Sequence, residues 1–194
     1  AKLVDKADKS TLTTKKDELA TSIGATATTA DKPQSKVDAY NTAKNEAEAA
    51  KSEAEGVIAN DNATTQQVTD ALNKVTAAKA KLDAARDAVN NAATAASKAA
   101  LATAAGNLDH APDTSTKTPD SIDAYNTAKQ AAQRDVDDAK AAAQAVAAKG
   151  DEATTAEVTA AQAKVDAAQA KLTAAEAKLV DKADKSTLTT KKDE

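Results

Sequence analysis

The same 18 residues occur at both ends of the chain. Residues 1–18 read AKLVDKADKSTLTTKKDE, and residues 177–194 repeat this sequence without a change. An identity of this length predicts that the chain samples one period, from residue 1 to residue 176, of a tandem array. Repeated units of this kind build length, curvature or multivalency by stacking on their neighbours, and they seldom hold a single active site. The duplication therefore favours folds that can be propagated along a chain.

Alanine dominates the composition of the chain. The 194 residues include 54 Ala and 25 Thr, whereas Leu, Ile and Val together number 24 and the only aromatic residues are Tyr40 and Tyr125. So few large apolar residues would ordinarily indicate disorder. The net charge of −4 is low, however, and the apolar residues recur at helical spacing. Because alanine favours helices and lets them approach closely, we expect ordered helical bundles with thin cores.

A heptad pattern runs through the middle of the chain. Apolar residues recur every seven positions, and an alanine lies three residues beyond each of them: Val68, Val75, Leu82, Val89 and Ala96. Between Gly56 and Gly106 there is no Gly and no Pro. The pattern therefore predicts one unbroken helix from about residue 68 to residue 105, with Asn90 and Asn91 as its weakest point.

Shorter identities show that each period contains two related units. The segment DAYNTAK at residues 38–44 recurs unchanged at residues 123–129, and LATSIG at residues 19–24 is matched by LATAAG at residues 101–106. Each unit spans three helical stretches, and the middle stretch of the second unit is longer by about one turn.

Capping boxes mark the start of the last helix in each unit. Thr64 with Gln67, and Thr154 with Glu157, have the spacing at which the two residues satisfy each other's free backbone N–H groups. The breaks, caps and apolar stripes together predict an all-α fold.

The expected architecture is two up-down-up three-helix bundles in tandem. We expect the first unit to cover residues 1–89 and the second residues 90–176, while residues 177–194 begin the next copy of the first. The bundles would be joined by a continuous shared helix, as in spectrin, into an elongated rod of about 80 to 100 Å. The sequence leaves open whether that helix bends at Asn90 and Asn91, or at Ser10 and its copy Ser186.

Few side chains suggest chemistry. His110, the only histidine, lies in a polar connector beside Asp109 and Asp113, but one imidazole in an acidic loop lacks the converging ligands of a metal site. We interpret it as a solvated loop residue. Tyr40 and Tyr125 occupy the same place in the two identical segments, and we favour core packing over a repeated ligand contact.

The remaining features predict a protein that is not an enzyme. The doublets Asp137-Asp138 and Lys15-Lys16 are interpreted as solvated helix faces with weak local ion pairs. No nucleophile, base and orienting group occur together, and neither a Gly-rich phosphate loop nor a Cys or His metal spacing is present. We therefore expect no catalytic, cofactor-binding or metal-binding residues and no cofactor; ligand-binding residues are unknown.

Charge and hydropathy narrow the range of partners. The 26 basic and 30 acidic residues are interspersed, so no basic stripe suits a nucleic acid. No apolar stretch approaches 18 residues, which argues against membrane insertion. We expect a monomer whose partners are the neighbouring repeats of the same chain.

The repeated motif resembles a known family. The pattern Asp-Ala-Tyr-Asn-Thr-Ala, then alanines every three or four residues, a break, Thr-x-x-Gln/Glu-Val and Val-x6-Leu is similar to FIVAR-type helical repeats of Gram-positive cell-wall-anchored surface proteins. These repeats occur in giant matrix-binding and biofilm-associated proteins of the Ebh and Embp type. Residues 33–89 and 119–179 carry the resemblance. It implies an extracellular, cell-wall-attached stalk, with fibronectin or other matrix binding in some members and no catalytic residues.

Two functional hypotheses follow. The first is a stiff helical stalk or spacer that projects an adhesive domain from a bacterial cell wall. The alternative is a multivalent adhesin whose repeats themselves bind a host matrix or serum protein, such as fibronectin or albumin. The residues Asn41, Thr42 and Lys44, which recur in the second unit, are too few to decide between them. A cytoplasmic filament or scaffold is a third possibility, because the sequence carries no address signal.

Overall fold

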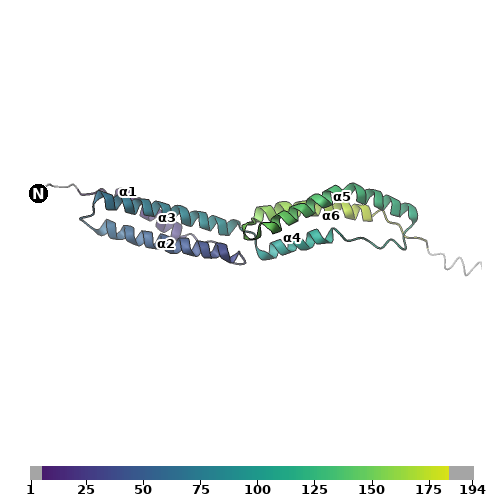
Figure 1. Cartoon of the computed structure of the whole chain (residues 1–194), viewed down its shortest axis with the longest axis horizontal. Helices are drawn as coiled ribbons and strands as arrows, with labels where there is room; N and C mark the ends of the chain where they lie inside the picture. Colours follow the sequence, from purple (N-terminus) through teal and green to yellow (C-terminus); the bar gives the residue numbers. More distant parts are fainter. Residues whose placement is uncertain (1–5, 184–194) are drawn as a thin grey trace, which may run out of the picture. The chain divides into compact units, whose positions relative to one another are not determined.

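The computed structural model describes residues 6–183 and divides the chain into two compact units. Unit 1 is Ala1–Ala95 and unit 2 is Ala96–Glu194. The described residues form α-helices, one short 3-10 helix and no sheet (Figure 1), which confirms the predicted all-α fold.

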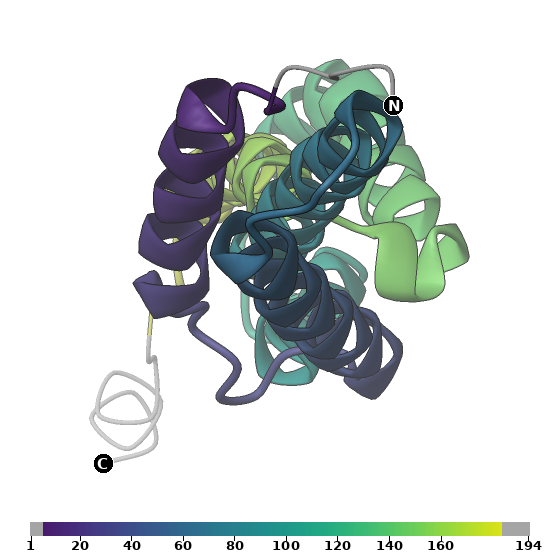
Figure 2. The ribbon, with the colours of Figure 1, turned by 90° about the vertical axis from the view of Figure 1, so that its left-hand side faces the viewer.

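Unit 1 contains helices α1 (Ser10–Gly24), α2 (Gln34–Ala59) and α3 (Thr65–Asn91). Helix α1 packs against both α2 and α3, and these two helices also pack against each other. Figure 2 shows α1 in dark purple beside the blue α2 and the blue-green α3.

The core of unit 1 combines alanines with a few larger side chains. Helix α1 contributes Leu12 and Leu19, both with no exposed surface, and the predicted heptad of α3 is buried as far as Val89. Helix α2 contributes alanines at helical spacing together with one large residue, Tyr40. Small side chains allow the helices to approach closely, so the few large residues fill the remaining volume.

Unit 2 contains helices α4 (Ala95–Asn107), α5 (Pro119–Ala148) and α6 (Thr155–Glu176), with a 3-10 turn at Gly150–Glu152. Helices α5 and α6 pack along each other. Helix α5 has 30 residues and α2 has 26, so the predicted extra turn is confirmed. Buried large residues come from all three helices and from the connector after α4: Leu101, Leu108, Tyr125, Val136, Val146, Val158, Val165 and Leu172.

Both predicted capping boxes are present. The Gln67 N–H donates to Thr64 Oγ1 at 3.2 Å, and the Thr64 N–H donates to Gln67 Oε1 at 2.8 Å. Thr154 and Glu157 make the same exchange at 3.2 and 3.0 Å. Free N–H groups at the first turn of each closing helix are satisfied in this way, which fixes where α3 and α6 begin.

The predicted unbroken helix from residue 68 to residue 105 is wrong. Helix α3 ends at Asn91 and α4 begins at Ala95. Lys32 Nζ donates to the carbonyl oxygens of Asn90 and Ala92 at 3.0 and 2.6 Å, and the Thr28 N–H donates to Asn90 Oδ1 at 2.9 Å. These contacts satisfy polar groups at the end of α3, where asparagine is also a poor helix former. The two units therefore share no continuous helix.

The duplicated segment is helical only in part where it is described: residues 10–18 belong to α1, whereas residues 6–9 and 177–183 lie outside the α-helices. Helix α1 begins only at Ser10, and α6 ends at Glu176, so the heptad does not continue through Leu179 as expected. An extended segment with one isolated β-bridge follows α6: the Thr118 N–H donates to the Val180 carbonyl and the Lys182 N–H to the Thr116 carbonyl, both at 2.8 Å. Pairing with this connector replaces helical hydrogen bonds. Residues 1–5 and 184–194, including Ser186, lie outside the described residues.

In unit 1, lysine contacts fix the places where the chain enters and leaves the bundle. Lys9, just before α1, donates from Nζ to the carbonyls of Ile58 and Asn60 at 2.9 and 2.6 Å, at the turn between α2 and α3. The end of α3 is held by Lys32, in the connector between α1 and α2. These two connections lie at opposite ends of an up-down-up bundle, so the chain enters at one end and leaves at the other.

Unit 2 has the same arrangement. Near the start of α4, Lys98 Nζ donates to the Gly150 carbonyl at 2.8 Å, in the turn between α5 and α6. The segment after α6 pairs with the connector between α4 and α5. An odd number of helical passages thus carries the chain from one end of each unit to the other.

We predict that Tyr40→Ala destabilises unit 1. Tyr40 is 5% exposed and donates from its hydroxyl to the Ala25 carbonyl at 3.4 Å. Removing a buried aromatic ring leaves a cavity, so the free energy of unfolding should fall by about 3 kcal/mol. Thermal unfolding followed by circular dichroism measures the loss. Tyr40→Phe removes only the hydroxyl and should cost less, about 1 kcal/mol; an unchanged melt for Tyr40→Ala would contradict the packing role.

Candidate functional site

The polar connector around His110 does not assemble a metal site. His110 is exposed, and its two acidic neighbours have other partners. Asp109 forms an ion pair with Lys140 of α5. Asp113 accepts hydrogen bonds from the N–H and hydroxyl of Ser115 at 2.9 and 3.1 Å, which lower the pKa of its carboxyl group. Within residues 6–183, no group of three or more possible ligands converges.

The two identical seven-residue segments present the same face to solvent in both units. Tyr40 and Tyr125 are each 5% exposed, which agrees with the packing interpretation. On the outer side of the same helices the side chains of Asn41, Thr42 and Lys44 are exposed or half-buried, as are their counterparts Asn126, Thr127 and Lys129. We call these six residues the repeated polar face. In unit 2, Lys129 Nζ lies 5.8 Å from the centre of the Tyr125 ring, close enough for a cation-π contact.

The charge doublets make local contacts at the surface. Lys15 Nζ lies 2.9 Å from Glu18 Oε1, and Lys16 Nζ lies 2.6 Å from Asp17 Oδ1. Asp137 accepts a hydrogen bond from Gln133 Nε2 at 2.9 Å. Asp137 and Asp138 are exposed as expected, whereas Lys15 and Lys16 are half-buried. Surface pairs of this kind contribute little free energy.

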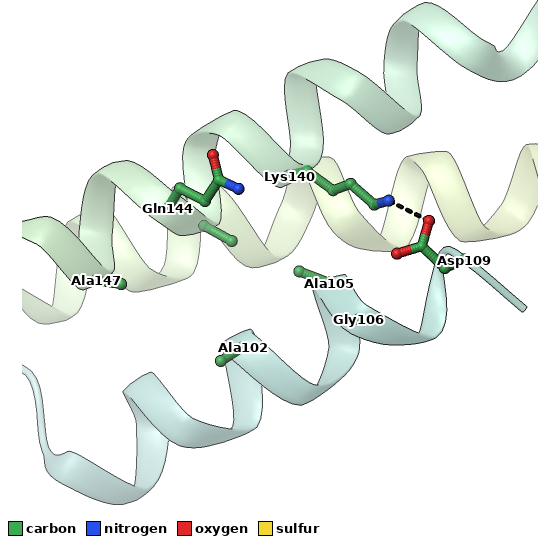
Figure 3. A pocket seen from close by; sticks show the side chains of 8 residues that line it. Ala102, Ala105, Gly106, Asp109, Lys140, Gln144 and Ala147 are labelled. Atoms are coloured by element: carbon green, nitrogen blue, oxygen red, sulfur yellow. Dashed lines mark hydrogen bonds and ion pairs between the residues drawn. The ribbon is translucent and has the colours of Figure 1, made fainter.

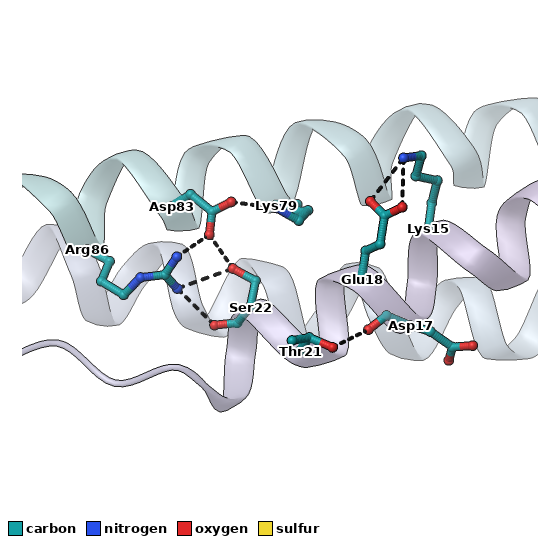
Figure 4. A network of polar contacts seen from close by, with 8 residues as sticks. All are labelled: Lys15, Asp17, Glu18, Thr21, Ser22, Lys79, Asp83 and Arg86. Atoms are coloured by element: carbon teal, nitrogen blue, oxygen red, sulfur yellow. Dashed lines mark hydrogen bonds and ion pairs between the residues drawn. The ribbon is translucent and has the colours of Figure 1, made fainter.

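A polar network between α1 and α3 was not predicted from the sequence (Figure 4). Its centre is Asp83 of α3, which accepts hydrogen bonds from Ser22 of α1 and from Arg86, and lies 2.7 Å from Lys79 Nζ. Arg86 Nη1 also donates to the carbonyl and hydroxyl oxygens of Ser22 at 3.0 and 3.2 Å. The network satisfies Ser22, one of two buried polar residues among those described, and the last turn of α1.

The pKa of the Asp83 carboxyl group is lowered in this network. Partial burial of the side chain raises the pKa, but the hydrogen bonds from Lys79, Ser22 and Arg86 outweigh that effect and lower the pKa to about 2. The carboxylate therefore stays ionised wherever the unit is folded above that pH, and it holds α1 against α3.

Unit 2 lacks this network and has a groove between α4 and α5 instead (Figure 3). Ala104 and Thr173 stand where unit 1 has Ser22 and Asp83, and Ala105 stands where unit 1 has Ile23. The smaller side chain leaves an open hollow of about 300 Å³. Its walls are mainly alanine and glycine, with Gln144 and the Lys140–Asp109 ion pair at the rim. The two charged residues that line the groove, Lys140 and Asp109, are paired with each other.

Comparison with protein families identifies the class of repeat. The FIVAR domain model matches twice, at residues 15–83 and 104–173, with one match in each unit. The chain belongs to the FIVAR family, which confirms the resemblance seen in its sequence motifs. The chain therefore carries two FIVAR repeats in tandem, and the FIVAR family is non-catalytic.

Comparison with individual proteins gives less information than the family match. No curated protein matches the chain. One solved structure, described as "Characterization of extracellular matrix binding protein- (Embp)-mediated Staphylococcus epidermidis adherence to fibronectin", shares 28% sequence identity, over 88% of this chain and 99% of its own. Its TM-score is 0.32, so the family assignment depends on the FIVAR match and not on superposition. Among the described helices, none combines the length and the apolar character needed to cross a membrane.

We predict that the Asp83 network makes unit 1 sensitive to acid. The folded pKa of about 2 is below the ordinary value of 3.8, so the stabilisation is complete above about pH 4 and is lost as the pH falls towards 2. Because the Asp83 side chain is 29% exposed, we expect a loss of about 1 to 2 kcal/mol. Each unit has one tyrosine, so NMR melts at pH 2 to 5 can follow the units separately.

The variant Asp83→Asn should flatten this dependence in unit 1. Asp87→Asn, at an exposed site on the same helix, is the matched control and should keep the wild-type profile. Equal acid sensitivity in wild type and Asp83→Asn would show that the network does not determine it.

Proposed function

We propose that the chain is a spacer, a repeat segment that projects an adhesive domain away from a Gram-positive cell wall to which the whole protein is attached. The observation that carries this proposal is the placement of entry and exit at opposite ends of each bundle, through the contacts of Lys9 and Lys32 in unit 1 and of Lys98 and Lys182 in unit 2. A unit of this topology adds its own length to the chain.

The length gained per unit follows from the helices. Helix α2 has 26 residues, and at 1.5 Å per residue it spans about 39 Å. Since α3 ends at Asn91, stiffness comes from each bundle separately and not from a shared helix. For this proposal we keep the repeat boundaries expected from the sequence, residues 1–89 and 90–176, with the next copy beginning at residue 177. The partners of each repeat are its neighbours in the same chain. In this role the protein is a monomer and needs no catalytic residue, cofactor or metal.

We predict that small-angle scattering shows an extended particle. A compact globule of 194 residues has a radius of gyration of about 16 Å, and a spacer should exceed that value clearly. Measurement at several protein concentrations excludes self-association as the cause. A radius of gyration near that of a compact globule would falsify the spacer proposal.

A second candidate function is supported by the repeated polar face. The same exposed side chains on α2 and α5 offer two equivalent contacts for a host matrix or serum protein, and many copies would gain avidity from weak sites. The related solved structure concerns adherence to fibronectin, which makes fibronectin the first ligand to test.

Calorimetry with fibronectin and with albumin separates the two functions. A spacer should give no heat of binding to either protein, which is the result we expect for the isolated chain. If heat is observed, replacing Asn41, Thr42, Asn126 and Thr127 by alanine should abolish it under the adhesin hypothesis. Asn73→Ala, at an exposed site on α3, is the control. Binding that survives the fourfold variant would exclude the repeated polar face as the site.

A further inference from the structure

The segment LVDKADK occurs twice in the chain, and each copy is described in a different setting. The copy at residues 179–185 follows the last helix of unit 2, and the copy at residues 3–9 precedes the first helix of unit 1. We call this sequence the linker segment. The structure describes its first five residues after unit 2 and its last four before unit 1. Together the two copies show how the segment contacts a unit on either side.

The first half of the linker segment binds the unit that precedes it. The Val180 carbonyl accepts from the Thr118 N–H at 2.8 Å and from Ser121 Oγ at 3.4 Å. Asp181 Oδ1 lies 2.8 Å from Lys117 Nζ, and these contacts lower the pKa of the Asp181 carboxyl group. Lys182 donates from its N–H to the Thr116 carbonyl at 2.8 Å.

The second half of the linker segment binds the unit that follows it. Ala7 packs against the core of unit 1, and Lys6 Nζ lies 3.7 Å from Asp61 Oδ1. Asp8 Oδ1 accepts from the Ser10 N–H at 2.9 Å, at the first residue of α1. Lys9 donates to the carbonyls of Ile58 and Asn60. These carbonyls lie at the C-terminal end of α2, where a helix has unsatisfied acceptors and attracts cations.

We propose that the linker segment is a two-sided connector, bound at the same time to unit 2 through Val180, Asp181 and Lys182 and to a following copy of unit 1 through the equivalents of Ala7, Asp8 and Lys9. The contacts of the two halves meet at one lysine, Lys182 in one copy and Lys6 in the other. No residue between them is left to serve as a hinge. The junction is then an ordered interface, and its partner is the next copy of the repeat.

This proposal rests on the spacer function, since it needs a following repeat. These few contacts are sufficient to order the junction because the linker segment is covalently joined to both units. A few hydrogen bonds and exposed ion pairs do not hold two separate molecules together, because association costs translational and rotational freedom. A segment tethered to both units meets them at a high effective concentration. The interface therefore operates within one chain and does not predict dimers.

The test is a distance measurement across the junction. The experiment uses a chain of two periods, in which residues 1–176 are followed by residues 1–194. The sequence has no cysteine, so Ala131→Cys in the first period and Ser52→Cys in the second accept spin labels at exposed helical sites. Double electron–electron resonance then reports the distribution of distances between unit 2 and the next unit 1. We expect one narrow distribution.

Two variants remove one half of the connector each. Thr118→Pro deletes the N–H that donates to Val180, and the Thr118 φ of −70° already suits proline. Lys9→Met in the second period deletes the contacts with the α2 terminus. Either variant should broaden the distribution, whereas Lys164→Met, at an exposed site on α6, should not. Circular dichroism checks that helix content is retained.

The outcomes distinguish this proposal from the spacer function. A broad distribution in the unmodified chain overturns the two-sided connector, and so does a narrow one that neither variant changes. If scattering still shows an extended particle, the spacer function stands and the repeats are joined flexibly. A compact particle with a narrow distribution would reject the spacer and keep the connector.

Discussion

Burial of alanine stripes is the constraint on which both bundles depend. Alanine provides three of the four buried residues of α2, three of the seven of α5 and three of the six of α6, and a few leucines and valines and the two tyrosines add volume. Such a face removes little apolar surface from water per residue, so it stabilises the fold only if the helices approach closely. Each unit of this chain has three helices, and polar contacts near the helix ends add to their packing. The stability of each unit therefore depends more on the polar contacts at its helix ends than the stability of a unit with a large apolar core would.

Those polar contacts also decide where the helices end. An alanine-rich chain has little intrinsic tendency to stop a helix. In unit 1, Lys32 and Thr28 provide partners at Asn90 and Ala92, and in unit 2 the connector at residues 116–118 pairs with the segment after α6. In each unit the closing helix thus ends near the connector between the first two helices, and this connector provides polar partners for the chain there. Because each unit has three helices, the chain leaves it at the end opposite to its entry, and an array of such units grows in length. Short segments join one unit to the next.

The two units differ in how the last turn of their first helix packs against the rest of the bundle. Unit 1 places Ile23 and the Asp83 network between its helices, and unit 2 has alanines at the matching positions of α4 and an open groove. In unit 1, the ion pairs and hydrogen bonds of Asp83 hold α1 against α3, and these contacts weaken when the Asp83 carboxylate is protonated. The repeated polar face, by contrast, is the same in both units. The interiors of the two units have thus diverged, whereas the segment that carries this face, at residues 38–44 and 123–129, is identical in both.

The sequence by itself determined the features that depend on local or periodic patterns. The all-α fold, the capping boxes at Thr64 and Thr154, the buried heptad to Val89 and the burial of both tyrosines follow from helical spacing and capping chemistry. Tertiary structure decided the rest. The break after Asn91 needs Lys32, 58 residues away from Asn90, and the network at Asp83 needs Ser22, 61 residues away. Local propensity marks Asn90 and Asn91 as a weak point of the helix but does not place the break or the network there. The partners that decide both are brought near only when the three helices have packed.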